Sequence, residues 1–145
     1  MLLSNARICN SAFELADADL EIENGRIKDI LPRGSKTGGL DLAGLLILPG
    51  FIDQHIHGCA GADTCDDNPD ALRRMSAYLA SQGVTSFCAA TMTIPFYRIE
   101  KILENARVFQ ESDFAGAELA GVHLEGPYLS AGRSGVQNPD FIRKP

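Results

Sequence analysis

The sequence predicts an α/β protein in which a small β unit precedes a parallel strand–helix repeat. In the first 48 residues, short strands are separated by turn residues. From residue 49 onward, apolar strands alternate with stretches whose apolar side chains recur every three or four positions. This alternation is typical of a parallel sheet whose strands are connected by helices. The chain has 145 residues, so residues 49–145 can hold about three units of roughly 30 residues each.

The amino-terminal unit is expected to consist of short strands and a hairpin. Residues 2–9 and 19–23 are predicted strands. Asn24-Gly25 is a strong signal for a two-residue hairpin turn, which would lead into a return strand at residues 26–31. Residues 41–48 then lead out of this unit towards the second one.

The second unit is predicted to contain three strands and two helices. Asn68 would cap the first helix, with Pro69 at the first helical position and Gly83 near its end. In chain order, we expect a strand at residues 50–57, this helix, a strand at 84–91, a helix at 95–110 and a strand at 118–125.

Each predicted helix has one apolar face that would pack against the sheet. Leu72, Met75 and Leu79 recur at helical spacing in the first helix, so Met75 is interpreted as a core residue. In the second helix, the expected buried side comprises Ile99, Ile102, Leu103 and Ala106.

His55 and His57 form the most informative motif, because they lie at the end of a predicted strand. Residues two apart in a strand project from the same face, so both imidazoles can approach one metal ion. Gly58 follows directly and lets the backbone turn tightly beside them. Histidines in sheets also make ordinary hydrogen bonds without a metal, and the pair by itself leaves both interpretations open.

A second segment places Glu125 at the end of the third predicted strand, directly before a Gly-Pro break. In barrels of parallel strands, active sites lie at the carboxyl ends of the strands. His55, His57 and Glu125 occupy such positions, and their donor types suit a zinc or iron site with an open coordination position. The alternative for Glu125 is an ordinary salt bridge. His123 either supports the site or is a core histidine.

Several segments resemble those of a known family. Residues 48–58, Leu-Pro-Gly-Phe-Ile-Asp-Gln-His-Ile-His-Gly, resemble the first barrel strand of the amidohydrolase superfamily. Residues 122–128, Val-His-Leu-Glu-Gly-Pro-Tyr, and residues 135–139, Gly-Val-Gln-Asn-Pro, are similar to the glutamate motif and substrate loop of the N-acetylglucosamine-6-phosphate deacetylases. Residues 85–91 resemble the second barrel strand of that family, so the resemblance runs along the whole chain.

The resemblance implies a fold and its division into domains. Residues 1–48 would be half of a small β-sandwich, and residues 49–145 the first three βα units of a metal-dependent-hydrolase (β/α)8 TIM barrel. A complete barrel needs about 250 residues, so the fold is expected to be incomplete as given. The family's catalytic aspartate and remaining metal histidines would lie beyond Pro145. We therefore expect no catalytic residue within this chain and no activity from it alone.

The resemblance also implies a reaction and the residues that serve it. The complete enzyme would hydrolyse N-acetylglucosamine 6-phosphate, a small amino-sugar phosphate, to glucosamine 6-phosphate and acetate. Glu125 would hold the main divalent metal, zinc or iron, while His55 and His57 would hold a second ion or complete the cluster. Val136 and Gln137 would line the sugar pocket. Many members of the family have histidine at the position of Gln137, and glutamine can hydrogen-bond but cannot carry charge.

Composition and charge bear on the partners and the compartment. Hydrophobic residues make up 45% of the chain and charged residues 22%, as in folded globular domains. The net charge is −6 and no basic run occurs, so we expect no nucleic-acid partner. No apolar run of 18 residues and no secretory signal occur, so we expect no membrane association and a cytoplasmic location. The resemblance implies a homodimer for the full-length enzyme.

The four cysteines show no Cys-x-x-Cys spacing and are expected to be reduced thiols. Cys59 follows His57 by two residues and could approach a metal, because a thiolate is a good zinc ligand. The favoured interpretation of Cys59 is a small buried side chain. Cys88 lies within an apolar strand and is interpreted as a core residue.

Two other function classes are weighed against the deacetylase. The first is another amidohydrolase that hydrolyses amides and shares only the first-strand motif. Such enzymes typically use a carboxylated lysine on the fourth strand, whereas here Glu125 supplies the carboxylate earlier, which discriminates against them. The second is a non-catalytic truncated module that needs a partner chain, because an open three-stranded sheet has unpaired edges. Mass and oligomeric state in solution would separate these cases.

Overall fold

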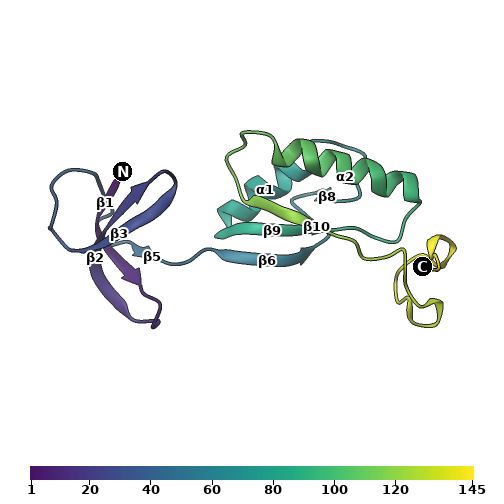
Figure 1. Cartoon of the computed structure of the whole chain (residues 1–145), viewed down its shortest axis with the longest axis horizontal. Coiled ribbons are helices and arrows are strands. Elements are labelled where there is room, and N and C mark those ends of the chain that lie inside the picture. The colour runs from purple at the N-terminus through teal and green to yellow at the C-terminus, as the bar shows by residue number, and fades with distance from the viewer. The chain divides into compact units, whose positions relative to one another are not determined.

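A computed structural model describes residues 1–145, which divide into two compact units, Met1–Pro49 and Gly50–Pro145 (Figure 1). The first unit is built of strands alone. The second contains both helices and a separate sheet. None of the helices combines the length and the apolar character needed to cross a membrane.

The first unit is one sheet with the strand order β3-β2-β1-β4, in which β5 also pairs with β1. The antiparallel hairpin is confirmed, because Asn24 and Gly25 both have positive φ, as a type I′ turn requires. The predicted start of the second strand at residue 19 is wrong, because Leu15 already pairs with Cys9. The elements are β1 (Leu2–Cys9), β2 (Leu15–Glu23), β3 (Arg26–Pro32), β4 (Leu40–Asp41) and β5 (Leu46–Ile47).

Asp19 is a buried acid that joins β2 to two other segments of the first unit. Its side chain is 1% exposed, and its two carboxylate oxygens accept hydrogen bonds from the backbone N–H groups of Asn5 and Gly34, both at 2.9 Å. Asn5 lies where the β1–β2 register shifts and has a φ of +57°. The carboxylate therefore accepts hydrogen bonds from backbone N–H groups at an irregularity of the sheet and at the turn that follows β3.

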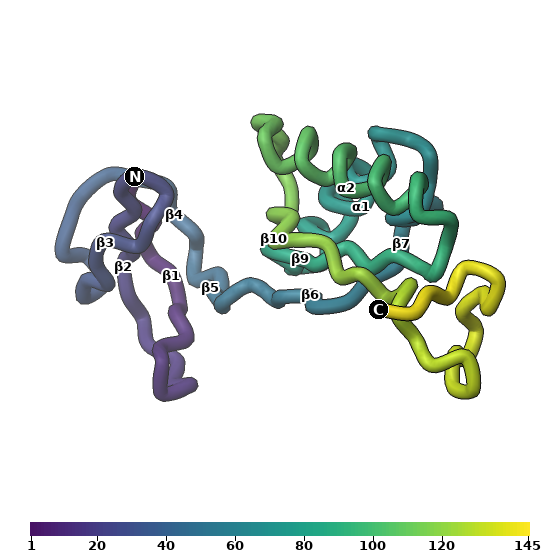
Figure 2. Tube along the Cα trace, turned by 45° about the vertical axis from the view of Figure 1, so that its right-hand side comes forward, coloured from purple at the N-terminus to yellow at the C-terminus, as the bar shows by residue number.

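The second unit has a parallel sheet with the order β10-β9-β6, so β9 is the central strand. Figure 1 shows both helices on one face of this sheet. Beyond β10 the chain leaves the sheet as a loop with two short 3-10 helices (Figure 2). The elements are β6 (Phe51–Ile56), β7 (Gly58–Cys59), β8 (Ala62–Asp63), α1 (Ala71–Ser81), β9 (Val84–Ala90), α2 (Phe96–Gln110), β10 (Glu118–His123), η1 (Ala131–Arg133) and η2 (Pro139–Phe141).

One hydrophobic core lies between the two helices and the sheet of the second unit. Met75 of α1 and Phe87 of β9 are fully buried, which confirms the core interpretation of Met75. The faces predicted for the helices are confirmed except for Leu103, which is 41% exposed. Phe109 is buried instead, because it continues the buried stripe of Ile99, Ile102 and Ala106, at i, i+3, i+7 and i+10 from Ile99.

In the second unit, two predicted element ends differ from the structure by two residues. The first helix starts at Ala71, with Asp70 as its N-cap, because Asn68 instead accepts a hydrogen bond from the backbone N–H of Asp70 and closes a preceding turn. The last strand ends at His123, two residues earlier than predicted. Glu125 therefore lies beyond the regular hydrogen bonds of the sheet.

Asp19→Ala is expected to lower the free energy of unfolding of the first unit by about 2–4 kcal/mol. The substitution leaves two backbone donors without their charged acceptor, and hydrogen bonds to charged groups contribute about 1.5–3 kcal/mol each. Amide hydrogen exchange of residues in β1 and β2 measures this change.

Asp17→Ala is the matched control, because Asp17 lies on the same strand but is exposed in its ion pair with Arg33. Its loss should change stability by no more than about 0.5 kcal/mol. Equal effects of the two substitutions would contradict the anchoring role of Asp19.

Candidate metal centre

His55, His57 and Glu125 meet at the carboxyl ends of β6 and β10. The Nε2 atoms of the two histidines are 3.2 Å apart. Oε2 of Glu125 lies 3.3 Å from Nε2 of His55 and 3.0 Å from Nε2 of His57. The structure thus brings together the three residues that the sequence singles out as metal ligands. All three side chains remain partly exposed.

The parallel sheet and two glycines explain why these side chains converge. Because β6 and β10 run parallel on either side of β9, their carboxyl ends lie at the same edge of the sheet. Gly58 begins a small hairpin directly after His57, and a Cβ at this position would lie 2.3 Å from the Ala62 carbonyl oxygen. Gly126 follows Glu125 with a φ of +98°, a conformation that favours glycine.

With Glu125 ionised, the protons of the two imidazoles cannot satisfy all three contacts in this cluster. If both imidazoles carry their proton on Nε2, each can donate to Glu125, but the two N–H groups then face each other. If one Nε2 is unprotonated, its lone pair faces the carboxylate oxygen instead. While the carboxylate is ionised, one of the three contacts is therefore repulsive in each arrangement. A cation between the three atoms makes all of them favourable.

The donor set and its spacing fit a tetrahedral metal site. Zinc binds imidazole nitrogen and carboxylate oxygen at about 2.0–2.2 Å, which places neighbouring ligand atoms of a tetrahedron about 3.3–3.6 Å apart. The three separations of 3.0–3.3 Å in the cluster are slightly shorter than these edges. Nδ1 of His57 is buried and has no hydrogen-bond partner within this chain. Three ligands leave a coordination position open, as in catalytic metal sites.

The two residues predicted to line a sugar pocket differ in exposure to solvent. Val136 is 89% exposed, whereas Gln137 is 4% exposed. The carboxamide oxygen of Gln137 accepts a hydrogen bond from the backbone N–H of Thr93 at 2.6 Å. The pocket-lining role of both residues stays a prediction.

Two further side chains near the cluster are not among its three donors. The ring of His123 packs edge-on against His55, with 4.7 Å between the ring centroids, and it is exposed, so the core interpretation of His123 is wrong. Cys59 packs against the core, and its Sγ lies 3.9 Å from the Met75 carbonyl oxygen. This position agrees with its interpretation as a small core side chain.

Thr93 is a residue near the cluster that the sequence analysis missed. It is 2% exposed, and its hydroxyl donates to the backbone carbonyl of Glu125 at 3.2 Å. The signal that could have found it is its place just after a predicted parallel strand, at the edge where active sites of such sheets form.

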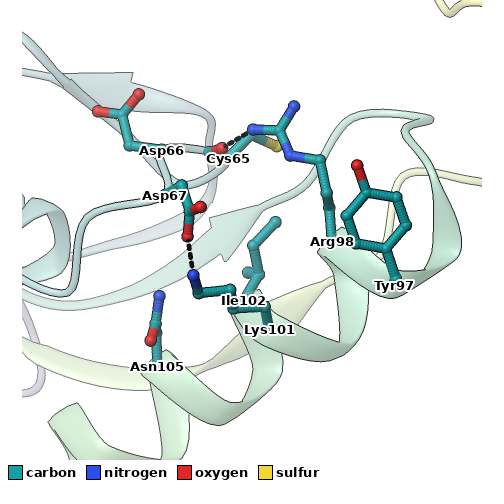
Figure 3. Close-up of a pocket in the computed structure, with 8 residues that line it drawn as sticks. All are labelled: Cys65, Asp66, Asp67, Tyr97, Arg98, Lys101, Ile102 and Asn105. Atoms are coloured by element: carbon teal, nitrogen blue, oxygen red, sulfur yellow. Dashed lines mark hydrogen bonds and ion pairs between the residues drawn. The ribbon is translucent and has the colours of Figure 1, made fainter.

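A separate cavity of 420 Å³ lies between the loop after β8 and α2 (Figure 3). Arg98 donates to the Cys65 carbonyl at 2.7 Å, and Lys101 pairs with Asp67. Its basic side chains therefore already have partners within the chain. The cavity contains none of the three clustered donors; its lining residues are Cys65, Asp66, Asp67, Tyr97, Arg98, Lys101, Ile102 and Asn105.

No family model matches the chain, but known proteins do. The N-acetylglucosamine-6-phosphate deacetylase of Bacillus subtilis (strain 168) is 48% identical over 101 residues, which are 68% of this chain and 26% of that protein. The N-acetylgalactosamine-6-phosphate deacetylase of Escherichia coli O157:H7 is 34% identical over 130 residues, 90% of this chain and 34% of that protein. The crystal structure of N-acetylglucosamine-6-phosphate deacetylase from Thermotoga maritima matches with a TM-score of 0.79 and 34% identity, covering 100% of this chain and 37% of that one.

Alkylation of Cys65 and Cys59 is expected to be several-fold slower at pH 8 in the folded chain than in the denatured chain. Burial is the main cause that raises the pKa of both thiols above the ordinary value, so a smaller fraction is reactive thiolate at this pH. Iodoacetamide labelling followed by peptide mass spectrometry measures each cysteine separately. Equal rates in the folded and denatured chain would contradict the buried positions.

Proposed function

Because the chain is a homologue of the N-acetylglucosamine-6-phosphate deacetylases and spans 26–38% of their length, we propose that it forms the amino-terminal, metal-binding part of such an enzyme. The proposed reaction is hydrolysis of the acetamide group of an amino-sugar phosphate, which releases acetate and the free amine. The observation that carries the proposal is the cluster of two imidazoles and one carboxylate at the carboxyl edge of a parallel sheet.

In this proposal, His55, His57 and Glu125 hold a divalent cation, either alone or shared with a second ion. A bound divalent cation lowers the pKa of its water to about 7 and polarises the carbonyl that is attacked. The three side chains fix the ion at the sheet edge and leave one side open for the acetamide. Zinc and iron are the proposed ions, because imidazole and carboxylate donors suit both.

We further propose that the three-stranded sheet is the first part of a (β/α)8 barrel and that the first unit is half of a β-sandwich. The exposure of the sheet face opposite the helices supports the barrel, because Ile52 and His123 on that face lie open to solvent. Both outer strands, β6 and β10, also lack a further neighbour. Five more βα units would cover that face and close both edges.

The relatives leave the configuration of the sugar open. The E. coli relative is named for N-acetylgalactosamine 6-phosphate and the B. subtilis relative for N-acetylglucosamine 6-phosphate. We propose the glucosamine form as the substrate, because several of the matching relatives carry that name. The proton shuttle is assigned to an aspartate outside this chain. The cytoplasmic location, the homodimer and the absence of nucleic-acid and membrane partners stay predictions.

Glu125→Gln is expected to weaken binding of Zn²⁺ or Co²⁺ to the 145-residue chain by about tenfold or more, because the cluster loses its only negative charge. Isothermal titration measures the affinity and the stoichiometry. Glu118→Gln makes the same charge change at the opposite, exposed end of β10 and should leave the affinity unchanged. Equal affinities of the two variants would contradict the metal site.

A chimera in which this chain replaces the matching segment of the B. subtilis deacetylase tests the activity itself. We expect the chimera to release acetate from N-acetylglucosamine 6-phosphate and Glu125→Gln to abolish this release, while the 145-residue chain alone stays inactive. The same assay with N-acetylgalactosamine 6-phosphate tests the choice of sugar. A folded, metal-loaded chimera without activity would overturn the proposed function.

A further inference from the structure

Residues 91–93, which directly follow β9, are held by three different parts of the second unit. Their backbone N–H groups donate, in order, to the His123 carbonyl oxygen at 3.0 Å, the Cys65 sulfur at 3.3 Å and the Gln137 carboxamide oxygen at 2.6 Å. The strand has ended at Ala90, so side-chain acceptors replace the sheet pairing for Met92 and Thr93. The short segment therefore has a defined place between the end of β10 and the carboxyl-terminal loop.

Thr93 connects this segment to Glu125. Its hydroxyl donates to the Glu125 carbonyl at 3.2 Å, although Glu125 already lies beyond the end of β10. Gly126 packs directly on the same side chain, and a Cβ at this glycine would lie 2.1 Å from Oγ1 of Thr93. One buried threonine, Thr93, therefore contacts the backbone of both Glu125 and Gly126.

Gln137 in turn fixes the position of Thr93. Its carboxamide oxygen accepts the Thr93 backbone N–H, and its nitrogen lies 3.6 Å from the sulfur of Met92. Both ends of the carboxamide are therefore engaged inside the protein. Its neighbour Val136 is exposed to solvent.

We infer that Thr93 and Gln137 are positioning residues that hold the Glu125 carboxylate against the two histidines. Gln137 supports the site through Thr93. The inference rests on the proposed metal-binding function of Glu125. A glutamate reaches Nε2 of both imidazoles at 3.0–3.3 Å only from a fixed backbone position, and loss of such supporting contacts typically weakens metal affinity by about 10–100-fold.

Thr93→Val removes the hydroxyl while keeping the shape of the side chain. We expect it to weaken Co²⁺ binding to the 145-residue chain by about tenfold and to change the absorption spectrum of the bound Co²⁺. Thr93→Ser retains the hydroxyl and should restore most of the affinity. Circular dichroism confirms that each variant is folded.

Thr91→Val is the matched control for the loss of a buried hydroxyl. Thr91 is fully buried in the same segment, and its Oγ1 has no hydrogen-bond partner. The control should bind Co²⁺ like the unchanged chain. Equal weakening by Thr91→Val and Thr93→Val would overturn the inference, because a general loosening of the segment would then explain both.

Gln137→Met separates the positioning role from contact with the sugar. A positioning role predicts weaker Co²⁺ binding in the absence of any sugar and faster hydrogen exchange of the Thr93 amide. A residue that only contacts the sugar would leave both measurements unchanged, and that result would overturn the inference for Gln137. Adding Thr93→Val to Glu125→Gln should cause little further loss of affinity, because Thr93 acts through Glu125.

A measurement without metal distinguishes failure of this inference from failure of the proposed function. If the unchanged chain binds no Co²⁺, the metal site is wrong, and the ¹⁵N resonances of the His57 ring then decide the positioning role. Because Glu125 lies 3.0 Å from Nε2 of His57, Thr93→Val should shift these resonances and Thr91→Val should not. Unshifted resonances in folded Thr93→Val would overturn the inference.

Discussion

The parallel direction of β6, β9 and β10 is the constraint on which the candidate site depends. Parallel neighbours bring their carboxyl ends to one edge, so residues far apart in the chain, such as His57 and Glu125, meet there. The central strand contributes no ligand to the cluster. It supplies the core through Phe87 and, in the residues that follow it, the support for the end of β10.

The cluster is an electrostatic arrangement that favours a cation. Three atoms with lone pairs or protons lie at mutual distances of 3.0–3.3 Å, and while the carboxylate is ionised no distribution of the imidazole protons satisfies every pair. Side chains placed in this way would move apart unless the backbone held them. The glycine turn after His57 and the buried Thr93 beneath Glu125 provide that restraint. The fold around His57 and Glu125 therefore sets the geometry of the site as much as the three donor side chains do.

Local patterns in the sequence predicted the six longer strands, the hairpin at Asn24-Gly25 and the three clustered donors. These features depend on the periodicity of apolar residues, on turn residues and on the rule that active sites lie at the carboxyl ends of parallel strands. Tertiary contacts decided the remaining features. Leu103 has helical spacing but lies at the margin of the buried stripe, and the inward orientation of Gln137 depends on a backbone donor 44 residues earlier. No local pattern encodes such a partner.

X-ray absorption spectroscopy at the zinc edge of the zinc-loaded 145-residue chain is the most direct measurement of the proposed centre. Coordination by His55, His57 and Glu125 predicts a shell of nitrogen and oxygen atoms at about 2.0–2.2 Å, with the outer-shell scattering of two imidazoles. A sulfur neighbour at about 2.3 Å would instead place the zinc on a cysteine. That result, or a shell without imidazole, would contradict the proposed site.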